Sequence, residues 1–440
     1  MEYSTAEELA SVAFITMGCA KNEVDSEHMA RRLVQSGYAL SDDPEAADIV
    51  IVNTCSFIQA ATEESIEAIL QVADFDSVAN GESKLVVAGC MPARYGAELE
   101  GEIPEASGFV ACDRESDIVS VLDDLLGIER LSGDGLVIPI ADLKDNCVSA
   151  YVKISDGCDR FCAYCTIPYI RGRYHSFSQH EIFDEVNHAV GRGAREIVLI
   201  AQDTGRWGSD LSPRSSLAQL MSDLADEWPD VWFRVMYIQP EGITDELISA
   251  VKEHDNICSY FDIPFQHANE RILKSMNRKG SGTQFLDLLA RIRKQIPSAT
   301  LRTTLIAGYP GETEEDFDEL CAFVEDAGFD YVGVFAYSQE DGTKASLLDC
   351  QIDEEEKAYR AQNLRDLADS LSSVRVADRV GSTIPVLVCG FEEDGQLYGR
   401  AQCQAPDVDG VTYLDGGNPG DIVTATIDDT LLYEMEGTMS

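Results

Sequence analysis

The sequence predicts an α/β fold in three parts: an N-terminal parallel α/β domain, a central partial (β/α)6 barrel and a small C-terminal antiparallel β-barrel. Over the first 140 residues, short apolar runs alternate with helix-like stretches, a pattern typical of a parallel sheet covered by helices. Six strand-and-helix units then follow one another between about residues 148 and 350. From residue 381 the pattern changes to short strands separated by Gly and Asp turns, which favours a small barrel. We expect domains at 10–140, 144–375 and 376–440.

In the first part, three apolar runs are typical of buried strands. They are Val12–Thr16, Ile49–Val52 and Leu85–Ala88, and helices are expected in Glu23–Ser36 and Ala61–Ala73. Each run is followed within a few residues by a cysteine: Cys19, Cys55 and Cys90. Because loops at the carboxyl ends of parallel strands converge, the three cysteines could share one ligand there. Each could also be a small buried residue at a strand end, since free cysteine is often buried.

The central part contains six predicted strands separated mostly by helices. The strands are Tyr151–Ile154, Glu196–Ala201, Val231–Ile238, Tyr260–Phe265, Ala299–Ala307 and Tyr331–Tyr337. The helices include Ser178–Gly191, Asp245–Lys252, Glu270–Met276, Gln284–Gln295 and Glu314–Ala327. In (β/α)8 barrels the chemistry lies in the loops after the strands. Here those loops carry a polar rim made of Cys158, Gln202-Asp203, Gln239, Gln266-His267, Gly308–Glu312 and Ser338.

The last part is strongly acidic. A helix is expected from Asp353 to Ser373, and strands follow at Ile384–Cys389, Gln396–Ala401, Val411–Leu414 and Ile422–Ile427. Between residues 381 and 440 there are eleven Asp and Glu residues against a single basic residue, Arg400, which gives a net charge of −10.

Composition limits the class of protein and its partners. With 45% hydrophobic residues in 440, general disorder is excluded. No apolar run approaches the roughly 18 residues that a membrane helix needs, and the acidic N-terminus is unlike a secretory signal, so we expect a cytoplasmic protein. The net charge of −46 should repel nucleic acid and attract basic proteins. General acidity for solubility is the alternative explanation.

A second group of cysteines, Cys158, Cys162 and Cys165, has the spacing C-x3-C-x2-C directly after a predicted strand. Three soft thiolates can bind zinc or an iron–sulfur cluster. Structural zinc normally needs four protein ligands, and no fourth Cys or His follows at short range, since His175 is ten residues on. A three-thiolate [4Fe–4S] cluster would leave one iron open for a substrate or cofactor. Ordinary core or surface positions are expected for Cys112, Cys147, Cys258, Cys321, Cys350, Cys389 and Cys403.

The segment from Asp156 to Cys165 resembles the C-x3-C-x-aromatic-C loop of radical S-adenosylmethionine enzymes, with Tyr164 as the aromatic residue. Together with the upstream cysteine trio and the C-terminal barrel, the whole chain resembles the methylthiotransferases of this superfamily, which combine an N-terminal cluster domain, a radical barrel and a TRAM domain. One departure is that Ser176-Phe177-Ser178 stands where the family usually has Ser-Arg-Pro, so a basic contact of that loop is missing.

The resemblance implies two [4Fe–4S] clusters, the first held by Cys19, Cys55 and Cys90 and the second by Cys158, Cys162 and Cys165. It implies that S-adenosylmethionine binds the open iron of the second cluster and is cleaved by one electron to a 5′-deoxyadenosyl radical that abstracts hydrogen. The first cluster would carry the inserted sulfur, and a second S-adenosylmethionine would supply the methyl group. An electron donor and a sulfur source are implied as partners, and no catalytic side chain is implied beyond the cluster ligands.

Candidate contacts to S-adenosylmethionine lie on the barrel rim: Tyr164, Gln202, Asp203, Gln266 and Gly308. For Gly308 the alternative is a turn that leads into the helix of Glu314–Ala327, which alone would justify the glycines of this loop.

Two branches of the family differ in substrate: one modifies an adenosine of transfer RNA, and the other the β-carbon of an aspartate in ribosomal protein S12. The RNA branch should offer positive charge on its TRAM domain, whereas here that domain is acidic and suits the basic S12 protein, free or within the small ribosomal subunit. The segments 260–267, 399–402 and 405–410 also resemble the S12 branch, although Gln404 stands where that branch often has Asp. We therefore favour S12. The alternatives are the transfer RNA enzyme and a non-catalytic iron–sulfur or zinc scaffold.

Overall fold

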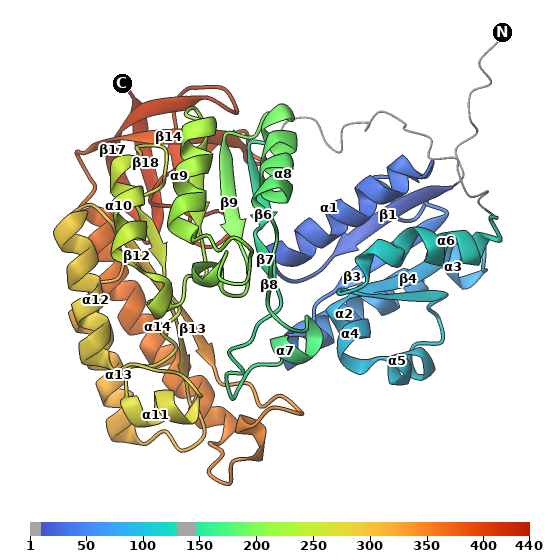
Figure 1. The fold of residues 1–440 in the computed structure, drawn as a ribbon, viewed down its shortest axis with the longest axis horizontal. Coiled ribbons are helices and arrows are strands. Elements are labelled where there is room, and N and C mark those ends of the chain that lie inside the picture. Colours follow the sequence, from blue (N-terminus) through green and yellow to red (C-terminus); the bar gives the residue numbers. More distant parts are fainter. Residues whose placement is uncertain (1–9, 130–146) are drawn as a thin grey trace. The chain divides into compact units, whose positions relative to one another are not determined.

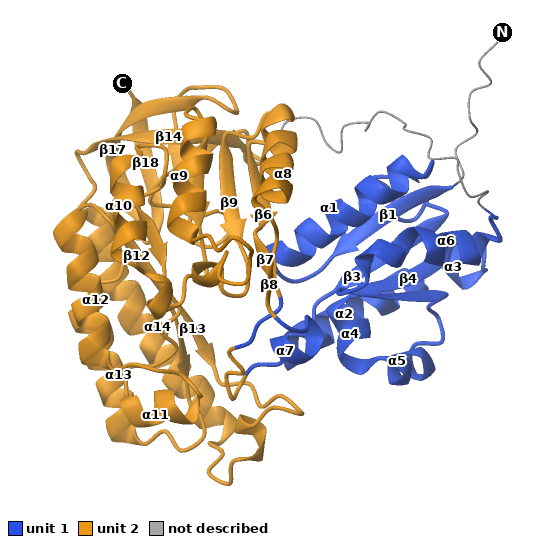
Figure 2. Cartoon of the chain, viewed as in Figure 1, with its two compact units in different colours: residues 1–144, 157–159, 165–173 blue, residues 145–156, 160–164, 174–440 orange. Residues whose placement is uncertain are grey.

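A computed structural model describes residues 10–129 and 147–440 and divides the chain into two compact units (Figure 2). Unit 1 comprises residues 1–144, 157–159 and 165–173, and unit 2 comprises residues 145–156, 160–164 and 174–440. The predicted boundary between the first two domains, at 140–144, lies outside the described residues.

Unit 1 contains a parallel sheet of five strands in the order β2-β1-β3-β4-β5 (Figure 1). The strands are β1 (Ser11–Thr16), β2 (Ala39–Leu40), β3 (Ile49–Thr54), β4 (Lys84–Gly89) and β5 (Gly108–Ala111). The three buried strands predicted from sequence are confirmed as β1, β3 and β4. They lie next to one another in the sheet, so their carboxyl ends share one edge.

Helices cover both faces of this sheet because its central strands are apolar on both sides. Side chains of β3 alternate between two cores. Val50 and Val52 pack with Ile69 of α2 (Gln59–Ala73), and Ile49 and Ile51 pack with helices on the other face. Those helices are α1 (Ala20–Gln35) and α6 (Ile118–Leu126). The shorter helices of the unit are α3 (Asp76–Ala79), α4 (Cys90–Tyr95), α5 (Ala97–Glu102) and α7 (Ile167–Ile170), with a 3-10 turn at Glu115–Asp117.

Unit 2 contains the predicted six β/α strands in chain order. They are β6 (Ser149–Lys153), β9 (Glu196–Ile200), β10 (Trp232–Val235), β11 (Tyr260–Asp262), β12 (Thr300–Ala307) and β13 (Tyr331–Ala336). They form two parallel sheets, β10-β9-β6 and β11-β12-β13. Backbone hydrogen bonds from Cys258 N to Phe233 O (2.9 Å) and from Ile238 N to Asp262 O (3.0 Å) join the two sheets. Within the described part of the chain, β6 does not pair with β13. The barrel is therefore open, as expected for a partial barrel.

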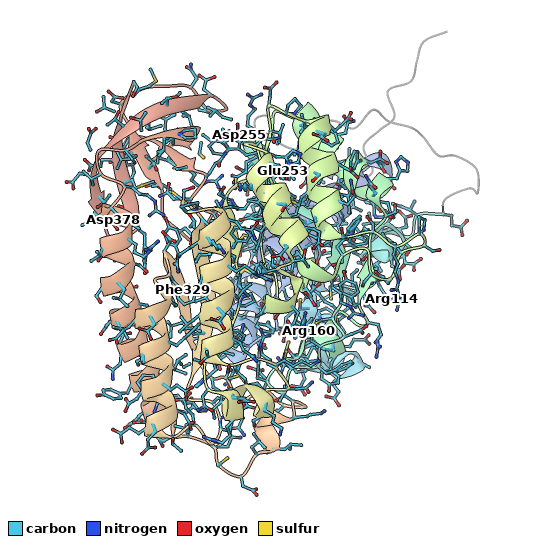
Figure 3. The ribbon with its side chains drawn as sticks, turned by 60° about the vertical axis from the view of Figure 1, so that its left-hand side comes forward. Arg114, Arg160, Glu253, Asp255, Phe329 and Asp378 are labelled. Carbon is cyan, nitrogen blue, oxygen red and sulfur yellow. The ribbon has the colours of Figure 1, made fainter. Side chains whose placement is uncertain are left out.

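The barrel strands pack against a layer of helices through the largest core of the molecule. The helices are α8 (Gln179–Gly191), α9 (Leu217–Glu227), α10 (Asp245–Glu253), α11 (Glu270–Ser275), α12 (Gly282–Gln295), α13 (Glu314–Ala327) and α14 (Glu354–Ala377). 3-10 turns lie at Thr204–Arg206, Pro240–Gly242 and Ala345–Leu347, and a two-stranded ribbon is made by β7 (Ser155–Asp156) and β8 (His175–Ser176). In Figure 3 the label Asp378 marks the C-cap of α14, and the first strand of the C-terminal segment begins at Thr383.

The C-terminal segment closes into a five-stranded barrel in the order β14-β15-β16-β18-β17. Its strands are β14 (Thr383–Phe391), β15 (Leu397–Ala401), β16 (Thr412–Leu414), β17 (Ile422–Leu431) and β18 (Glu434–Met439). The small barrel is confirmed, with two corrections. The sequence did not predict β18, whose residues show no apolar run, and the β16–β18 pair is parallel, so the barrel is not wholly antiparallel.

No helix in residues 10–129 or 147–440 is both long enough and apolar enough to span a bilayer.

Candidate functional site

The three N-terminal cysteines lie at the shared edge of β1, β3 and β4. Cys19 precedes the first residue of α1, Cys55 follows β3, and Cys90 begins α4. A Cβ atom added to Gly18 would lie 2.5 Å from Cys55 Cβ and 2.9 Å from Cys55 Sγ, so the first two cysteine loops touch. Cys55 also interacts electrostatically with both Cys19 and Cys90. The structure therefore brings the predicted trio together.

Asn22 links the three cysteine loops through one fully buried amide. Its Nδ2 donates to Met17 O and to Thr54 O, both at 2.9 Å, and these carbonyls lie just before Cys19 and Cys55. Its Oδ1 accepts from Cys90 Sγ at 3.7 Å. Sequence reasoning missed Asn22, although a polar residue three positions after Cys19 on the buried face of a helix was a usable signal.

Cys90 differs electrostatically from Cys55. A hydrogen bond from Cys112, opposed by burial and helped by the charge of Arg171, lowers the pKa of Cys90 to about 7. Burial raises the pKa of Cys55 to about 11. Cys112, for which the sequence predicted no role, packs against Cys90 in the same small buried cluster and donates to Ile170 O at 3.6 Å. Of Cys55 and Cys90, it is therefore Cys90 whose surroundings favour the thiolate.

The second cysteine group lies in a loop whose residues fall in both units. Residues 157–159, with Cys158, and 165–173, with Cys165, belong to unit 1, whereas residues 160–164, with Cys162, belong to unit 2. Cys158 N donates to Gly172 O at 3.2 Å. In unit 2 the partly buried Arg278 approaches Cys162 Sγ with its Nη1 at 3.9 Å and also donates from Nη2 to Pro264 O.

Three of the predicted rim residues present buried acceptor atoms. Asp203 is 1% exposed, and its Oδ2 accepts from Arg160 Nε at 2.6 Å (Figure 3 labels Arg160). Gln202 donates from Nε2 to Asp156 Oδ1 at 3.0 Å. Among the described residues, Asp203 Oδ1, Gln202 Oε1 and Gln239 Oε1 have no hydrogen-bond partner although all are buried. Burial also raises the pKa of Asp203 against the pull of Arg160. Such acceptors suit a ligand that carries N–H donors.

The remaining predicted contacts lie on the β11–β12 side of the barrel. Gln266 adopts a positive φ of 72° and exchanges backbone hydrogen bonds with Thr304 and Ile306. Gly308, at φ +76°, donates its N–H to both carboxylate oxygens of Glu312 at 3.0 and 3.1 Å. Its backbone donor is therefore already used within the turn that precedes α13. Tyr164 packs partly buried against a cluster of Ala163, Ile272, Met276, Tyr309, Tyr337 and Ala345.

Both cysteine groups fit an iron–sulfur cluster by the chemistry of their donors, since each supplies three thiols that are soft ligands. In residues 10–129 and 147–440 no three His, Cys, Asp or Glu side chains are already arranged around a common metal position. Arginine nitrogens lie close to one sulfur of each group, Arg171 Nη2 at 3.8 Å from Cys90 Sγ and Arg278 Nη1 at 3.9 Å from Cys162 Sγ.

Three family models match successive parts of the chain. The uncharacterized protein family UPF0004 matches residues 11–111, the radical SAM superfamily matches residues 152–324, and the TRAM domain matches residues 380–439. The matches fit the expected order of an N-terminal cluster domain, a radical barrel and a TRAM barrel.

Curated relatives match the chain over nearly its full length. The ribosomal protein uS12 methylthiotransferase RimO of Desulfosudis oleivorans is 40% identical over 437 residues, which cover 97% of this chain and 99% of the relative. The enzyme of the same name from Clostridioides difficile is 40% identical over 438 residues, with 98% of each chain covered. The chain belongs to the ribosomal protein uS12 methylthiotransferase family. As a member, it is a radical S-adenosylmethionine methylthiotransferase that uses S-adenosylmethionine and iron–sulfur chemistry, which confirms the expected enzyme class.

Solved structures support the fold of this family member. The radical S-adenosylmethionine methyltransferase TsrM from Kitasatospora setae, solved with cobalamin and a [4Fe–4S] cluster, superposes with a TM-score of 0.53 at 12% identity, covering 74% of this chain and 73% of that one. The cobalamin-dependent enzyme OxsB gives a TM-score of 0.52 at 12% identity over 82% and 56% of the two chains. At this identity the likeness concerns the fold alone.

Proposed function

We propose that this protein methylthiolates the β-carbon of an aspartate in ribosomal protein uS12. The observation that carries the proposal is the similarity, at about 40% identity over nearly the whole chain, to enzymes named for this reaction. A ribosomal substrate also favours a cytoplasmic location. The transfer RNA branch of the family is not favoured, and the charge of the C-terminal barrel supports the same choice.

The C-terminal barrel exposes carboxylate side chains, whereas its single basic residue is buried. Arg400, the single basic residue after position 380, is 6% exposed and its Nη1 lies 2.7 Å from Glu196 Oε2 in an ion pair, so it offers no charge to a phosphate. A hollow of roughly 520 Å³ on the barrel is lined by five carboxylates: Glu392, Asp394, Asp415, Asp428 and Glu436. This surface is complementary to a basic protein and repels nucleic acid.

Two [4Fe–4S] clusters are part of the proposal. Cys19, Cys55 and Cys90 would hold the first, and Cys158, Cys162 and Cys165 the second. When bound, the second cluster supplies the electron that cleaves S-adenosylmethionine, and the first supplies sulfur, so an electron donor and a sulfur source are needed as partners. The division into domains 10–140, 144–375 and 376–440 is proposed with them, since each family match lies within one of these ranges.

The side chains of the barrel rim bind and orient S-adenosylmethionine in this proposal. Asp203 Oδ1 and Gln202 Oε1 accept hydrogen bonds from its ammonium group, because both are buried acceptors without a protein partner in the described chain. Arg160 holds the second oxygen of Asp203 and favours its ionised form, in opposition to burial, which raises the pKa of Asp203. Tyr164, Gln266 and Gly308 complete the set of proposed contacts.

The substrate is tested by competition between two candidates. The full-length protein, reconstituted with iron and sulfide under anaerobic conditions and reduced, is offered a peptide from the uS12 loop together with a transfer RNA anticodon stem-loop. Mass spectrometry then detects a methylthio group in place of hydrogen. We expect modification of the peptide alone, and modification of the RNA alone would overturn the proposal. Absence of 5′-deoxyadenosine would instead favour a non-catalytic scaffold.

The number of clusters is tested by iron content. A variant that lacks Cys19, Cys55 and Cys90 and a second that lacks Cys158, Cys162 and Cys165 should each retain about half of the iron of the parent. Full iron content in either variant would contradict the ligand assignment, and zinc in place of iron would contradict the cluster itself. A matched control replaces Cys321, Cys350 and Cys389, which lie outside both groups, and should retain all of the iron.

A further inference from the structure

Arg171 is a buried arginine that lies six residues after Cys165, yet its partners belong to the N-terminal cysteine site. It falls in the segment 165–173 that belongs to unit 1, and its side chain is only 2% exposed. A buried arginine must be paired to be tolerated, so its partners indicate what it does.

One terminal nitrogen of Arg171, Nη2, contacts three side chains of the N-terminal cysteine site. Nη2 lies 2.7 Å from Asp25 Oδ2 and 2.8 Å from Asn22 Oδ1, and both acceptors come from the first turns of α1, just after Cys19. The same nitrogen lies 3.8 Å from Cys90 Sγ. Asp25 is 1% exposed, so the ion pair is shielded from water. Because Nη2 carries two hydrogens and Asp25 and Asn22 are the nearer acceptors, its contact with sulfur is a shared one, and the two residues fix the positive charge of the guanidinium beside Cys90.

We propose that Arg171, held by Asp25 and Asn22, is a positioning residue that places its positive charge beside the sulfur of Cys90 and makes the N-terminal cluster easier to reduce. The inference rests on the proposed function, because it takes Cys90 as a ligand of that cluster. It goes further by giving a role to three side chains that are not ligands.

The direction of the effect follows from charge. Reduction adds an electron, and a positive charge close to ligand sulfur stabilises the more negative state, which raises the reduction potential. The negative charge of Asp25 acts in the opposite direction and lowers the reduction potential. Its effect is the smaller one, because Asp25 is linked to Cys90 only through Arg171, whereas Arg171 contacts the sulfur itself.

The test isolates the N-terminal cluster in the full-length chain by replacing Cys158, Cys162 and Cys165 with alanine. In that parent we compare Asp25→Asn/Arg171→Gln, which neutralises both partners and so does not leave one charge of a buried pair behind, with Arg171→Lys. The control is Asp330→Asn/Arg379→Gln, which neutralises a second buried pair, joined at 2.7 Å in unit 2. The readouts are iron content and the midpoint potential followed by electron paramagnetic resonance.

We expect the Asp25→Asn/Arg171→Gln variant to hold iron with a more negative midpoint potential. At the midpoint potential of the parent, its ratio of reduced to oxidised cluster should fall at least tenfold, which corresponds to about 59 mV for a one-electron couple. Arg171→Lys keeps the charge and should show a smaller shift than the double variant, and the potential of the control should equal that of the parent.

An unchanged potential in Asp25→Asn/Arg171→Gln, or an equal shift in the control, would overturn the inference. A parent that binds no iron at all would instead contradict the proposed two-cluster function. The two failures are therefore distinguishable.

Discussion

Glu312 is a fully buried carboxylate at the turn before α13, and it shows how single polar residues organise the barrel rim. Its oxygens accept from Gly308 N, from Arg360 Nη1 at 2.8 Å and from His267 Nε2 at 3.2 Å. Burial alone would raise the pKa of Glu312, but the hydrogen bonds from His267 and Arg360 hold it below its ordinary value of 4.5. The carboxylate therefore fixes Gly308 and the segment that follows β12.

Replacing Glu312 with glutamine should cost about 3 kcal/mol of the free energy of unfolding at neutral pH, because it removes one charge of a buried pair. A carboxyl group whose folded pKa is lowered stabilises the fold above its ordinary pKa of 4.5, and that contribution is lost as the pH falls through the folded value. The difference in free energy of unfolding between the parent and Glu312→Gln should therefore be largest at neutral pH and should decrease below pH 4.5. Urea unfolding at several pH values measures this difference.

The matched control for this prediction is Glu325→Gln on the exposed face of α13, which should change stability little at any pH. A difference between the parent and Glu312→Gln that stays constant with pH would contradict the ionised state of Glu312.

At the scale of elements, the N-terminal site depends on how closely the ends of β1, β3 and β4 approach one another. Gly89 ends β4 directly before Cys90 and adopts a φ of +96°. A Cβ atom there would lie 2.3 Å from Asn53 Oδ1 and 2.5 Å from Thr54 O. Only glycine allows both the backbone conformation and the contact. The strand ends can therefore meet only because a side chain is absent at this point.

Replacing Gly89 with alanine should push the Cys90 loop away from Cys55 and reduce the iron bound by the N-terminal site. Gly96 provides a matched control, because it also has a positive φ, of +56°, but a Cβ atom there would meet nothing within 4 Å. Gly96→Ala should cost only the backbone strain of roughly 1–2 kcal/mol and keep its iron. Iron analysis and thermal unfolding of the two variants measure the difference, and equal iron loss in both would contradict the steric explanation.

At the scale of the whole molecule, the net charge of −46 governs association with a basic substrate. Neutralising two carboxylates of the barrel hollow, with Asp415→Asn and Glu436→Gln, should weaken binding of uS12 several-fold at low salt and less at high salt, because exposed charges are screened. The control variant Glu64→Gln/Glu67→Gln changes the net charge equally on the exposed side of α2. Titration calorimetry at two salt concentrations compares them, and equal weakening would mean that only the total charge matters.

Much of the fold could be predicted because its strands are marked by short apolar runs, and Cys19, Cys55 and Cys90 stand at the ends of three of them. The strand β18 could not be predicted, since Glu434–Met439 contains acidic residues and Gly437 in place of an apolar run. The contact between Asn22 and Arg171 joins residues 149 positions apart, and no local pattern records such a pairing. Sequence patterns thus located the cysteines, but only the three-dimensional arrangement gave their polar neighbours.

The segment 165–173 has a consequence for the order in which the chain is made. Arg171 belongs to unit 1, but it leaves the ribosome after all five strands of the sheet of that unit. A nascent chain that has reached only residue 144 lacks the guanidinium that contacts Asp25, Asn22 and Cys90. The contacts of the N-terminal cysteine site are therefore complete only after translation has passed residue 171, which lies well inside the predicted central domain.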